Sequence, residues 1–417
     1  MKIRALTLGT NTEYIEEEYD EFEELLHSFH DLKQDFQDIN IDVETIRMCT
    51  PPFHKDTHLN QSMFYSNPTI VLDALDDFCD DGLLDFYSAH AGLCDQVEDL
   101  TKTQIKLINR IPSLLSEHEN MFTSLQVSSL HGINFEAIQH ASELTKEIAK
   151  IDGFLNLKFA ATFNVKPNTP FFPSAYHLGK NLKLTIALEA ADEIINISKK
   201  YCNEDCGMHE IHTHIQERFT KIYDDISTIA KPFSEKHHIQ FVGVDFSPAQ
   251  YPVPDKSIAK AIESFELSKF GEIGTVFGIG FLTSALKSID RPQIGFSGFM
   301  QPLLEDYFIA KRHEEGLVNI TQLLLNSCVC GLGLDCIPLP GDINVETLAL
   351  LMMDVAMISS RLNKPLTTRL MPIEGKKSGE MTEFNFEYFK NSTICDIAKN
   401  SNFKLNEFVK KNRNIQI

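Results

Sequence analysis

The chain has 417 residues, and its 38 Lys and Arg against 59 Asp and Glu give a formal net charge of −21. Nucleic acids and anionic membranes favour basic protein surfaces, so this charge argues against both kinds of partner. A hydrophobic content of 43% and a charged content of 23% are ordinary for a globular protein with a large core.

The cysteines and the N-terminus indicate where the protein resides. Nine cysteines are scattered along the chain, which favours reduced thiols in a cytoplasm over the disulfide framework of a small secreted protein. Residues 1–9 hold too short an apolar run for a signal peptide, and no apolar stretch approaches the ~18 residues of a membrane span. We therefore expect a cytoplasmic protein. We also expect a small-molecule ligand as its partner, and the sequence leaves a homo-oligomer open.

Short β-type segments alternate with helical segments along the chain. The sequence predicts strands at residues 3–8, 41–48, 84–90, 122–128, 157–165, 184–188, 239–246, 293–297, 336–339 and 366–371. It predicts helices around residues 15–29 and at 68–79, 103–111, 135–151, 190–201, 211–230, 256–267, 275–288, 302–315 and 345–362. This alternation, with no Pro/Gly/Ser-rich linker, predicts one α/β domain over residues 1–394 and a polar tail or cap over residues 395–417.

Residues 167–177 form an unusual loop after a predicted strand. Three prolines stiffen its backbone, and its aromatic side chains need somewhere to pack. The loop could form a pocket wall that delivers His177, or it could fold over the core with His177 in a structural hydrogen bond. After the next strand, Glu189 and Asp192 are spaced to share one helix face, where they could bind a ligand or favour the helix dipole.

Residues 328–342 carry a second candidate site. If this segment is extended, Cys328 and Cys330 lie on one face, and Asp335 and Asp342 flank a short apolar strand. Thiol chemistry, a soft-metal site or a carboxylate pair would fit. The alternative is that the cysteines are small buried hydrophobic residues and that Asp342 caps the helix beginning near Asn344.

Two further segments carry polar groups of the right kind for a site. Lys376, in a Gly-Lys-Lys-Ser-Gly-Glu stretch, could hold an anionic substrate group or lie in a solvated turn. A group of residues of the types that bind metals lies close together in the sequence: Cys202, Cys206, His209, His212 and His214. Their spacing does not match that of a familiar zinc finger.

Several stretches, read together, carry a family resemblance. The most specific are Pro-Phe-Phe-Pro-Ser-Ala-Tyr-His at 170–177 and Cys-Val-Cys-Gly-Leu-Gly-Leu-Asp at 328–335. The others lie at residues 3–9, 132–134, 164–165, 188–192, 243–247, 297–298, 305–306, 340–342 and 375–384. In this order they resemble an uncharacterised family of bacteria and archaea whose members are labelled pyruvate formate-lyase-like.

The resemblance implies the fold of glycyl radical enzymes, a ten-stranded α/β barrel made of two five-stranded parallel halves set antiparallel. Those enzymes carry a radical glycine in a motif like Arg-Val-x-Gly-Tyr, which is missing here, so no glycyl radical is expected. The chain also departs from the family. Residues 270–275 replace a Cys-Gly-Thr-His-Gly-Thr segment without its histidine, and residues 385–387 replace Gly-Gly-Leu.

Residues and resemblance together predict an enzyme that acts on a small polar metabolite by acid/base or thiol chemistry, not radical chemistry. His177 and Glu189 would transfer protons, and Cys328 or Cys330 would be the nucleophile. The substrate would contact Asn164, Phe172, Tyr176, Asp245, Ser297, Asp335 and Lys376.

Two alternatives to this enzyme stay open. The first is a non-catalytic metabolite-binding or regulatory protein that retains the barrel fold. The second is a divalent cation site for Ca or Mg, since both ions prefer oxygen ligands. Its ligands would come from Glu189, Asp192, Asp245 or Asp342.

Overall fold

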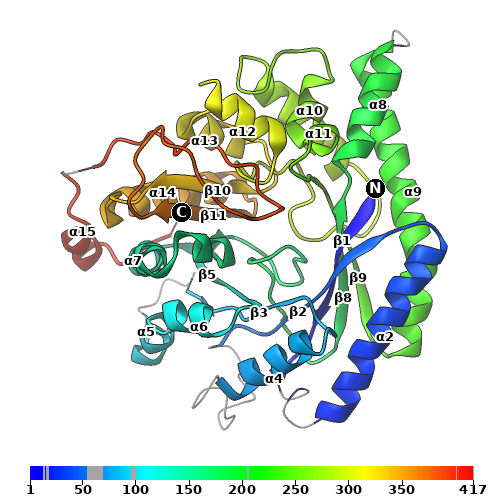
Figure 1. The fold of residues 1–417 in the computed structure, drawn as a ribbon, viewed down its shortest axis with the longest axis horizontal. Coiled ribbons are helices and arrows are strands. Elements are labelled where there is room, and N and C mark those ends of the chain that lie inside the picture. The colour runs from blue at the N-terminus through cyan, green and yellow to red at the C-terminus, as the bar shows by residue number, and fades with distance from the viewer. Residues whose placement is uncertain are drawn as a thin grey trace.

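The structure is a computed structural model that describes residues 1–12, 15, 18–53, 69–94, 100–203, 206–400 and 402–416. Its strands lie in the middle of the molecule and its helices lie around them (Figure 1). Within the described residues, no helix has both the length and the apolar character that crossing a membrane would require.

One large mixed sheet forms the centre of the fold. In spatial order its strands are β10 (Gly333–Pro340), β11 (Leu366–Ile373), β7 (Phe159–Phe163), β5 (Met121–Ser129), β3 (Phe86–Ser88), β2 (Val43–Cys49), β1 (Lys2–Gly9), β8 (Lys183–Glu189) and β9 (Gln240–Ala249). From β1 to β7 along this path the pairing is parallel, whereas β8 and β11 run antiparallel to β1 and β7. β9 is parallel to β8 and β10 to β11, so the sheet has three parallel sets.

The helices cover the outside of this sheet. They are α2 (Tyr19–Asp38), α4 (Thr69–Asp80), α5 (Lys102–Ile108), α6 (Ile111–Glu117), α7 (Phe135–Ile151), α8 (Ala191–Asn203), α9 (Met208–Lys236), α10 (Ile258–Glu263), α11 (Thr275–Lys287), α12 (Tyr307–Glu314), α13 (Ile320–Ser327), α14 (Val345–Leu362) and α15 (Leu405–Lys411). Strands such as β7 and β10 are buried along their whole length, as expected for strands covered on both faces. The 3-10 helix η1 (Gly153–Lys158) leads into β7.

The C-terminal tail is folded onto the domain. The short strand β12 (Asn414–Ile415) pairs antiparallel with β6 (Gly132–Asn134), which itself pairs with β5. The ring of Phe408 in α15 packs edge-on against Phe135 at the start of α7, with ring centroids 5.1 Å apart. The tail therefore contributes strand pairing and aromatic packing to the fold.

The predicted α/β class is confirmed, but the ten-stranded barrel is not. In the described part of the chain the ladder is open between β9 and β10, which are approached only by single bridges from Gln293 and Pro302. The predicted strand at 293–297 is missing because Gly295 and Ser297 have φ values of 59° and 41°, far from extended backbone. The prediction also missed α13 and the division of residues 102–117 into α5 and α6.

Candidate functional site

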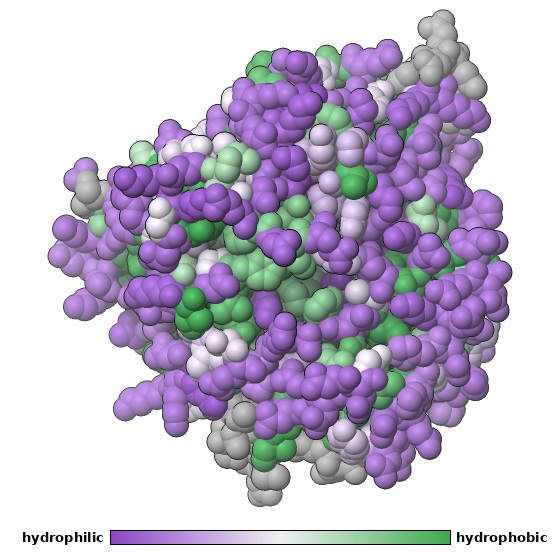
Figure 2. All heavy atoms as spheres, viewed as in Figure 1, coloured by the Kyte–Doolittle hydropathy of each residue, from purple (hydrophilic) through white to green (hydrophobic). Residues whose placement is uncertain are grey.

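A cavity of about 130 Å³ is lined by residues of both the central and the terminal strands of the sheet path. Its wall includes side chains from β1, β2, β3 and β5 on one side and from β10 and β11 on the other, so the sheet must curve around it. The charged and phenolic groups of the wall are Arg4, Glu44, Arg47, Glu305, Asp335, Arg369 and Tyr388. On the face shown in Figure 2, hydrophobic side chains gather near the centre and are ringed by hydrophilic ones.

Most of the remaining wall is apolar and aromatic. The ring of Phe122 lies 5.5 Å from the rings of both Phe86 and Phe172, measured between centroids. Such a continuous aromatic surface favours a ligand with an apolar part. The apolar wall residues include Phe86, Phe122, Phe171, Phe172, Phe296, Met300, Leu332 and Phe386.

The first charge cluster of the wall is centred on Arg369 in β11. Its guanidinium donates to both carboxylate oxygens of Asp335, at 2.5 and 2.8 Å, and to Glu305 Oε1 at 2.8 Å. Burial raises the pKa of Asp335, although Arg369 acts in the opposite direction. A proton on this group is therefore less costly than on an ordinary aspartate.

The thiol of Cys336 belongs to the same cluster. It donates to Glu305 Oε1 at 3.1 Å, and burial raises the pKa of the thiol well above its usual value, so the group stays protonated. Cys336 has a φ of 47° at a break in the β10–β11 register, which marks an irregularity in β10. Thiolate chemistry is therefore disfavoured here, and the thiol acts as a hydrogen-bond donor.

Three residues of this cluster are candidate ligands for a metal ion. Among the described residues, Glu305, Asp335 and Cys336 form the group whose ligand atoms come within 4.8 Å of one another. Arg369 already forms ion pairs with both carboxylates, and a Ca or Mg ion would have to displace it. A protonated thiol is also a poor partner for ions that prefer oxygen ligands. The donor set therefore does not fit Ca or Mg.

A second charge cluster is centred on Arg4 in β1. Its Nη1 donates to Glu44 at 3.0 Å and to Glu189 at 3.0 Å, and Lys256 Nζ lies 2.7 Å from the other Glu189 oxygen. The Arg4 guanidinium also lies 4.8 Å above the ring of Tyr388. Burial opposes ionisation of Glu44, but Arg4 holds the pKa of that carboxyl below its usual value.

Arg47 in β2 differs from the other two arginines of the wall. Its Nε donates to Thr45 Oγ1 at 2.8 Å, and the guanidinium lies 5.8 Å from the ring centroid of Phe86 and 5.2 Å from that of Phe172. Among the described residues it forms no ion pair and no other hydrogen bond. Burial and, to a smaller extent, the charge of Arg4 lower its pKa to about 10.

The structure does not bring His177 and Glu189 together. His177 Nε2 donates to Gly179 O at 2.9 Å, and its Nδ1 lies so close to Gly9 that a Cβ there would be 2.7 Å away. Glu189 instead pairs in register with Lys2, seven residues from Gly9 along β1, which corresponds to roughly 23 Å of strand. Neither residue lines the cavity.

His177 and Tyr176 both make contacts that hold the loop in place. Burial lowers the pKa of His177 to about 4, so the imidazole is neutral near pH 7. The Tyr176 hydroxyl donates to Val165 O at 2.9 Å. Phe172 is the loop residue, among the predicted ones, that reaches the cavity wall.

The two candidate nucleophiles lie in different environments outside the cavity. Cys328 is exposed at the end of α13, whereas Cys330 is buried in a turn, where its Sγ accepts from Gly333 N at 3.3 Å. The segment is therefore not extended, and the two thiols do not share a face. The interpretation as a small buried hydrophobic residue fits Cys330 alone.

Other predicted contact residues support the backbone or lie on the surface. The Asp245 carboxylate accepts from the backbone N–H groups of Ser247, Phe296 and Ser297 at 2.7 to 2.9 Å, and burial raises its pKa. The Ser297 hydroxyl accepts from Phe246 N at 3.0 Å. The Asn164 side chain contacts Asn363 at 3.4 Å, and Lys376 pairs with Glu383 at 3.0 Å.

The predicted cation ligands are also engaged elsewhere. Asp192 accepts from the N-terminal amine at 2.9 Å, and Asp342 pairs with Lys399, which lowers the pKa of Asp342. Asp342 does not cap α14, because Asn344 Oδ1 accepts from Thr347 N and takes that role.

The predicted Cys/His cluster is not assembled in the described residues. The Cys202 side chain lies outside them, and His209 projects from the exposed start of α9. The His212 ring packs against Phe281, with centroids 5.7 Å apart, and His214 Nδ1 lies 3.1 Å from Glu217.

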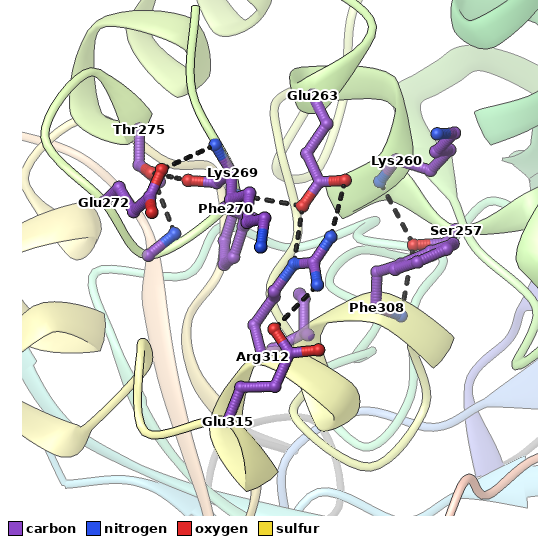
Figure 3. A network of polar contacts seen from close by, with 12 residues as sticks. Ser257, Lys260, Glu263, Lys269, Phe270, Glu272, Thr275, Phe308, Arg312 and Glu315 are labelled. Carbon is purple, nitrogen blue, oxygen red and sulfur yellow. Dashed lines mark hydrogen bonds and ion pairs between the residues drawn. The ribbon is translucent and has the colours of Figure 1, made fainter.

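A separate buried ion-pair network is structural. Arg312 donates to both oxygens of Glu263, at 2.7 and 3.0 Å, and to Glu315 at 2.7 Å (Figure 3). Glu263 also accepts from Phe270 N at 3.0 Å, and Thr275 Oγ1 accepts from Gly271 N at 2.9 Å. The network therefore fixes residues 270–275, the segment in which the chain departs from the resemblance described above.

Sequence reasoning found Phe172 and Asp335 in the cavity but missed Arg4, Arg47 and Arg369. A signal was present, because a charged residue inside an otherwise apolar strand is seldom buried without a partner or a role. Arg47 lies between Ile46 and Met48 in this way.

Comparisons with known proteins agree on one family. The model of the family described as "Uncharacterised ACR (DUF711)" matches residues 1–391. The UPF0210 protein of Carboxydothermus hydrogenoformans is 30% identical over 295 residues, which are 68% of this chain and 65% of that protein. UPF0210 protein MJ1665 of Methanocaldococcus jannaschii is 28% identical over 339 residues, 79% of this chain and 72% of that protein. UPF0210 protein PAE3581 of Pyrobaculum aerophilum is 28% identical over 284 residues, with 67% and 62% covered.

The chain thus spans less than two thirds of the length of two of these relatives, 65% and 62%, and 72% of the length of the third. None of the descriptions names an activity, and nothing in them links the family to pyruvate formate-lyase. The predicted membership of an uncharacterised family is confirmed: the chain belongs to the family described as Uncharacterised ACR (DUF711).

Proposed function

We propose that the protein is an enzyme that moves a proton on a small metabolite bound in the central cavity, with Glu305 as the acid–base group. One observation carries this proposal: a single cavity presents two neighbouring carboxylates, the half-buried Glu305 and the buried Asp335, held by Arg369 beside an apolar wall. General acid–base catalysis needs a titratable group within hydrogen-bond reach of the ligand and protected from bulk water.

The hydrogen bonds favour Glu305 over Asp335 for this role. Both oxygens of Asp335 are occupied by Arg369, and its side chain is 6% exposed. Glu305 is 16% exposed and uses Oε1 for both Arg369 and Cys336. Among the described residues its Oε2 accepts no hydrogen bond, so that oxygen can take a proton from a ligand. Asp335 and Cys336 then position Glu305.

The test measures the exchange of hydrogen for deuterium in metabolites of a cell extract, so the substrate need not be known beforehand. The purified protein is incubated in D2O with the small-molecule fraction of a cell extract, and mass spectrometry detects metabolites that gain deuterium or change in amount. The wild type should alter at least one metabolite, and Glu305→Gln should abolish that change. Glu383→Gln, which removes a carboxylate on the exposed side chain paired with Lys376, is the matched control and should behave like the wild type. Equal activity of Glu305→Gln and wild type would refute the role of Glu305.

A non-catalytic binding or regulatory protein is the second candidate, and one observation favours it. Each carboxylate of the wall already has an arginine partner, as ligand-binding cavities with fixed charges often do. Under this alternative the same extract would yield a metabolite retained by the protein in equilibrium dialysis but unchanged in mass and structure.

We also propose that the sheet is a barrel of the glycyl radical enzyme type without the radical glycine. Support comes from the five parallel strands β1, β2, β3, β5 and β7, flanked on each side by an antiparallel joint. The bridges of Gln293 with Val244 and of Pro302 with Asp335 lie where a further strand would connect β9 to β10.

A further inference from the structure

The cavity wall holds one guanidinium without a carboxylate partner. Of the three arginines in the wall, Arg4 is paired with Glu44 and Arg369 with Asp335 and Glu305. Arg47 has no such partner among the described residues. Arg47 is half-buried, and even partial burial of an unpaired cation is unfavourable, so a retained unpaired guanidinium beside a cavity points to a ligand that supplies the opposite charge.

The contacts of Arg47 leave its terminal amino groups available. Nε is fixed by Thr45 Oγ1, whose own hydroxyl donates to Arg4 O at 2.7 Å. Phe86 and Phe172 lie against the guanidinium, which limits its movement. The two Nη groups therefore present the planar fork that pairs with the two oxygens of a carboxylate.

The charges of the wall favour a ligand with a single negative charge. Arg4 and Arg369 between them hold the three carboxylates of the wall, which leaves Arg47 as the wall guanidinium without an ion pair among the described residues. Because the carboxylates are held by the other two arginines, a monoanion at Arg47 would complete the ion pairs. A phosphate dianion would bring a second charge, which no remaining cation of the wall would neutralise.

The size and character of the cavity restrict the rest of the ligand. Its volume of about 130 Å³ is close to the roughly 150 Å³ of a protein cavity that accepts benzene. The aromatic rings of the wall favour an apolar body of that size. We infer that Arg47 binds the carboxylate of a small monocarboxylic acid whose apolar body, about one six-membered ring in size, lies against the phenylalanine wall. The inference rests on the proposed function in that it names the ligand class of the same cavity.

Calorimetric titration of the full-length protein tests this inference with defined probes. Benzoate combines the charge with the ring, benzyl alcohol keeps the ring without the charge, acetate keeps the charge without the ring, and phenyl phosphate carries a second charge. Benzoate should bind at least tenfold more tightly than the other three, because both the ion pair and the apolar contact contribute.

Variants then assign the charge recognition to Arg47. Arg47→Gln should weaken benzoate binding by tenfold to a hundredfold, and Arg47→Lys should fall between that variant and the wild type because it keeps the charge but not the fork. Arg218→Gln is the matched control: it removes a guanidinium that pairs with Glu193 outside the cavity, and it should bind benzoate like the wild type. Urea denaturation of each variant verifies that it is folded.

The outcomes separate this inference from the proposed function. Equal benzoate affinity of folded Arg47→Gln and wild type, or equal affinity for benzoate and benzyl alcohol, would overturn the role of Arg47. Tighter binding of phenyl phosphate than of benzoate would overturn the monocarboxylate class. Loss of benzoate binding in Arg47→Gln supports the inference even if no extract metabolite is turned over, because titration measures binding alone.

Discussion

The buried imidazole of His177 should make stability depend on pH in a calculable way. Burial lowers its pKa from the ordinary 6.5 to about 4 in the folded protein. Between these values the unfolded chain binds more protons than the folded chain, so the free energy of unfolding falls as the pH is lowered from 6.5 towards 4. Each pKa unit corresponds to about 1.4 kcal/mol, so the contribution at pH 4.5 is a loss of about 2.5 kcal/mol relative to pH 7.5.

The perturbation that isolates this effect is His177→Leu, measured by urea denaturation at pH 7.5, 6.5, 5.5 and 4.5. At pH 7.5 the variant should be less stable by about 1 kcal/mol, since it loses the hydrogen bond to Gly179 O. At pH 4.5 the variant should be more stable than the wild type by about 1.5 kcal/mol. Comparing the two proteins at each pH cancels the contribution of Asp306, whose pKa burial raises to about 6 and which acts in the opposite direction.

His131→Leu, which removes an exposed histidine, is the control and should keep the pH dependence of the wild type. A difference between His177→Leu and wild type that stays constant within about 0.5 kcal/mol from pH 7.5 to 4.5 would refute the reasoning. That result would mean that Nδ1 of His177, which has no hydrogen-bond partner among the described residues, acquires one when it is protonated.

Three further predictions concern stability measured by urea denaturation. In the absence of ligand, Arg47→Gln should match the stability of the wild type or exceed it by up to about 1 kcal/mol, because it removes an unpaired, half-buried cation. A clear loss of stability would indicate a structural role instead. Arg312→Met should lower the free energy of unfolding by roughly 3 kcal/mol, because it leaves Glu263 without its ion-pair partner. The control Arg291→Met, which breaks an exposed pair with Asp224, should have little effect. Equal effects of the two substitutions would contradict the structural role of the Arg312 network. Gly295→Ala should lower the free energy of unfolding by about 2 kcal/mol more than Gly316→Ala. Both glycines have positive φ, but only at Gly295 would the new Cβ clash, because it would lie 2.1 Å from Asp245 Oδ2. Similar losses in the two variants would show that the loop relaxes.

The strands could be predicted because their signal is local. Runs such as residues 184–188 are apolar and bounded by polar residues, and β8 forms there as expected. The segment 293–297 was also predicted as a strand, but the carboxylate of Asp245 binds the backbone of residues 296 and 297 and fixes it in a non-extended shape. A contact between residues so distant in sequence leaves no mark in the local pattern.

The cavity could be predicted only in part for a related reason. Phe172 was predicted from the loop after the strand at 157–165, and Asp335 from the segment that flanks the short strand at 336–339; both line the cavity. Arg4, Arg47 and Arg369 lie within strands, and which strand faces meet depends on the curvature of the sheet rather than on any one segment. Glu189 was found for its carboxylate, but its role could not be foreseen, because its partners Arg4 and Lys256 come from remote elements.

The residues of the cavity wall are spread along most of the chain, and this affects when the cavity forms during folding. Its residues extend from Arg4, in the first strand, to Tyr388, close to the end of the family match. Only a fragment that spans at least residues 4–388 contains the whole wall, so a shorter nascent or proteolysed fragment lacks part of the proposed site. Closing such long loops in the backbone is slow and entropically unfavourable, which makes the site one of the last features to form during folding. A molecule that occupies it would bind only the completed fold and would hold the first and last parts of the chain together by mass action.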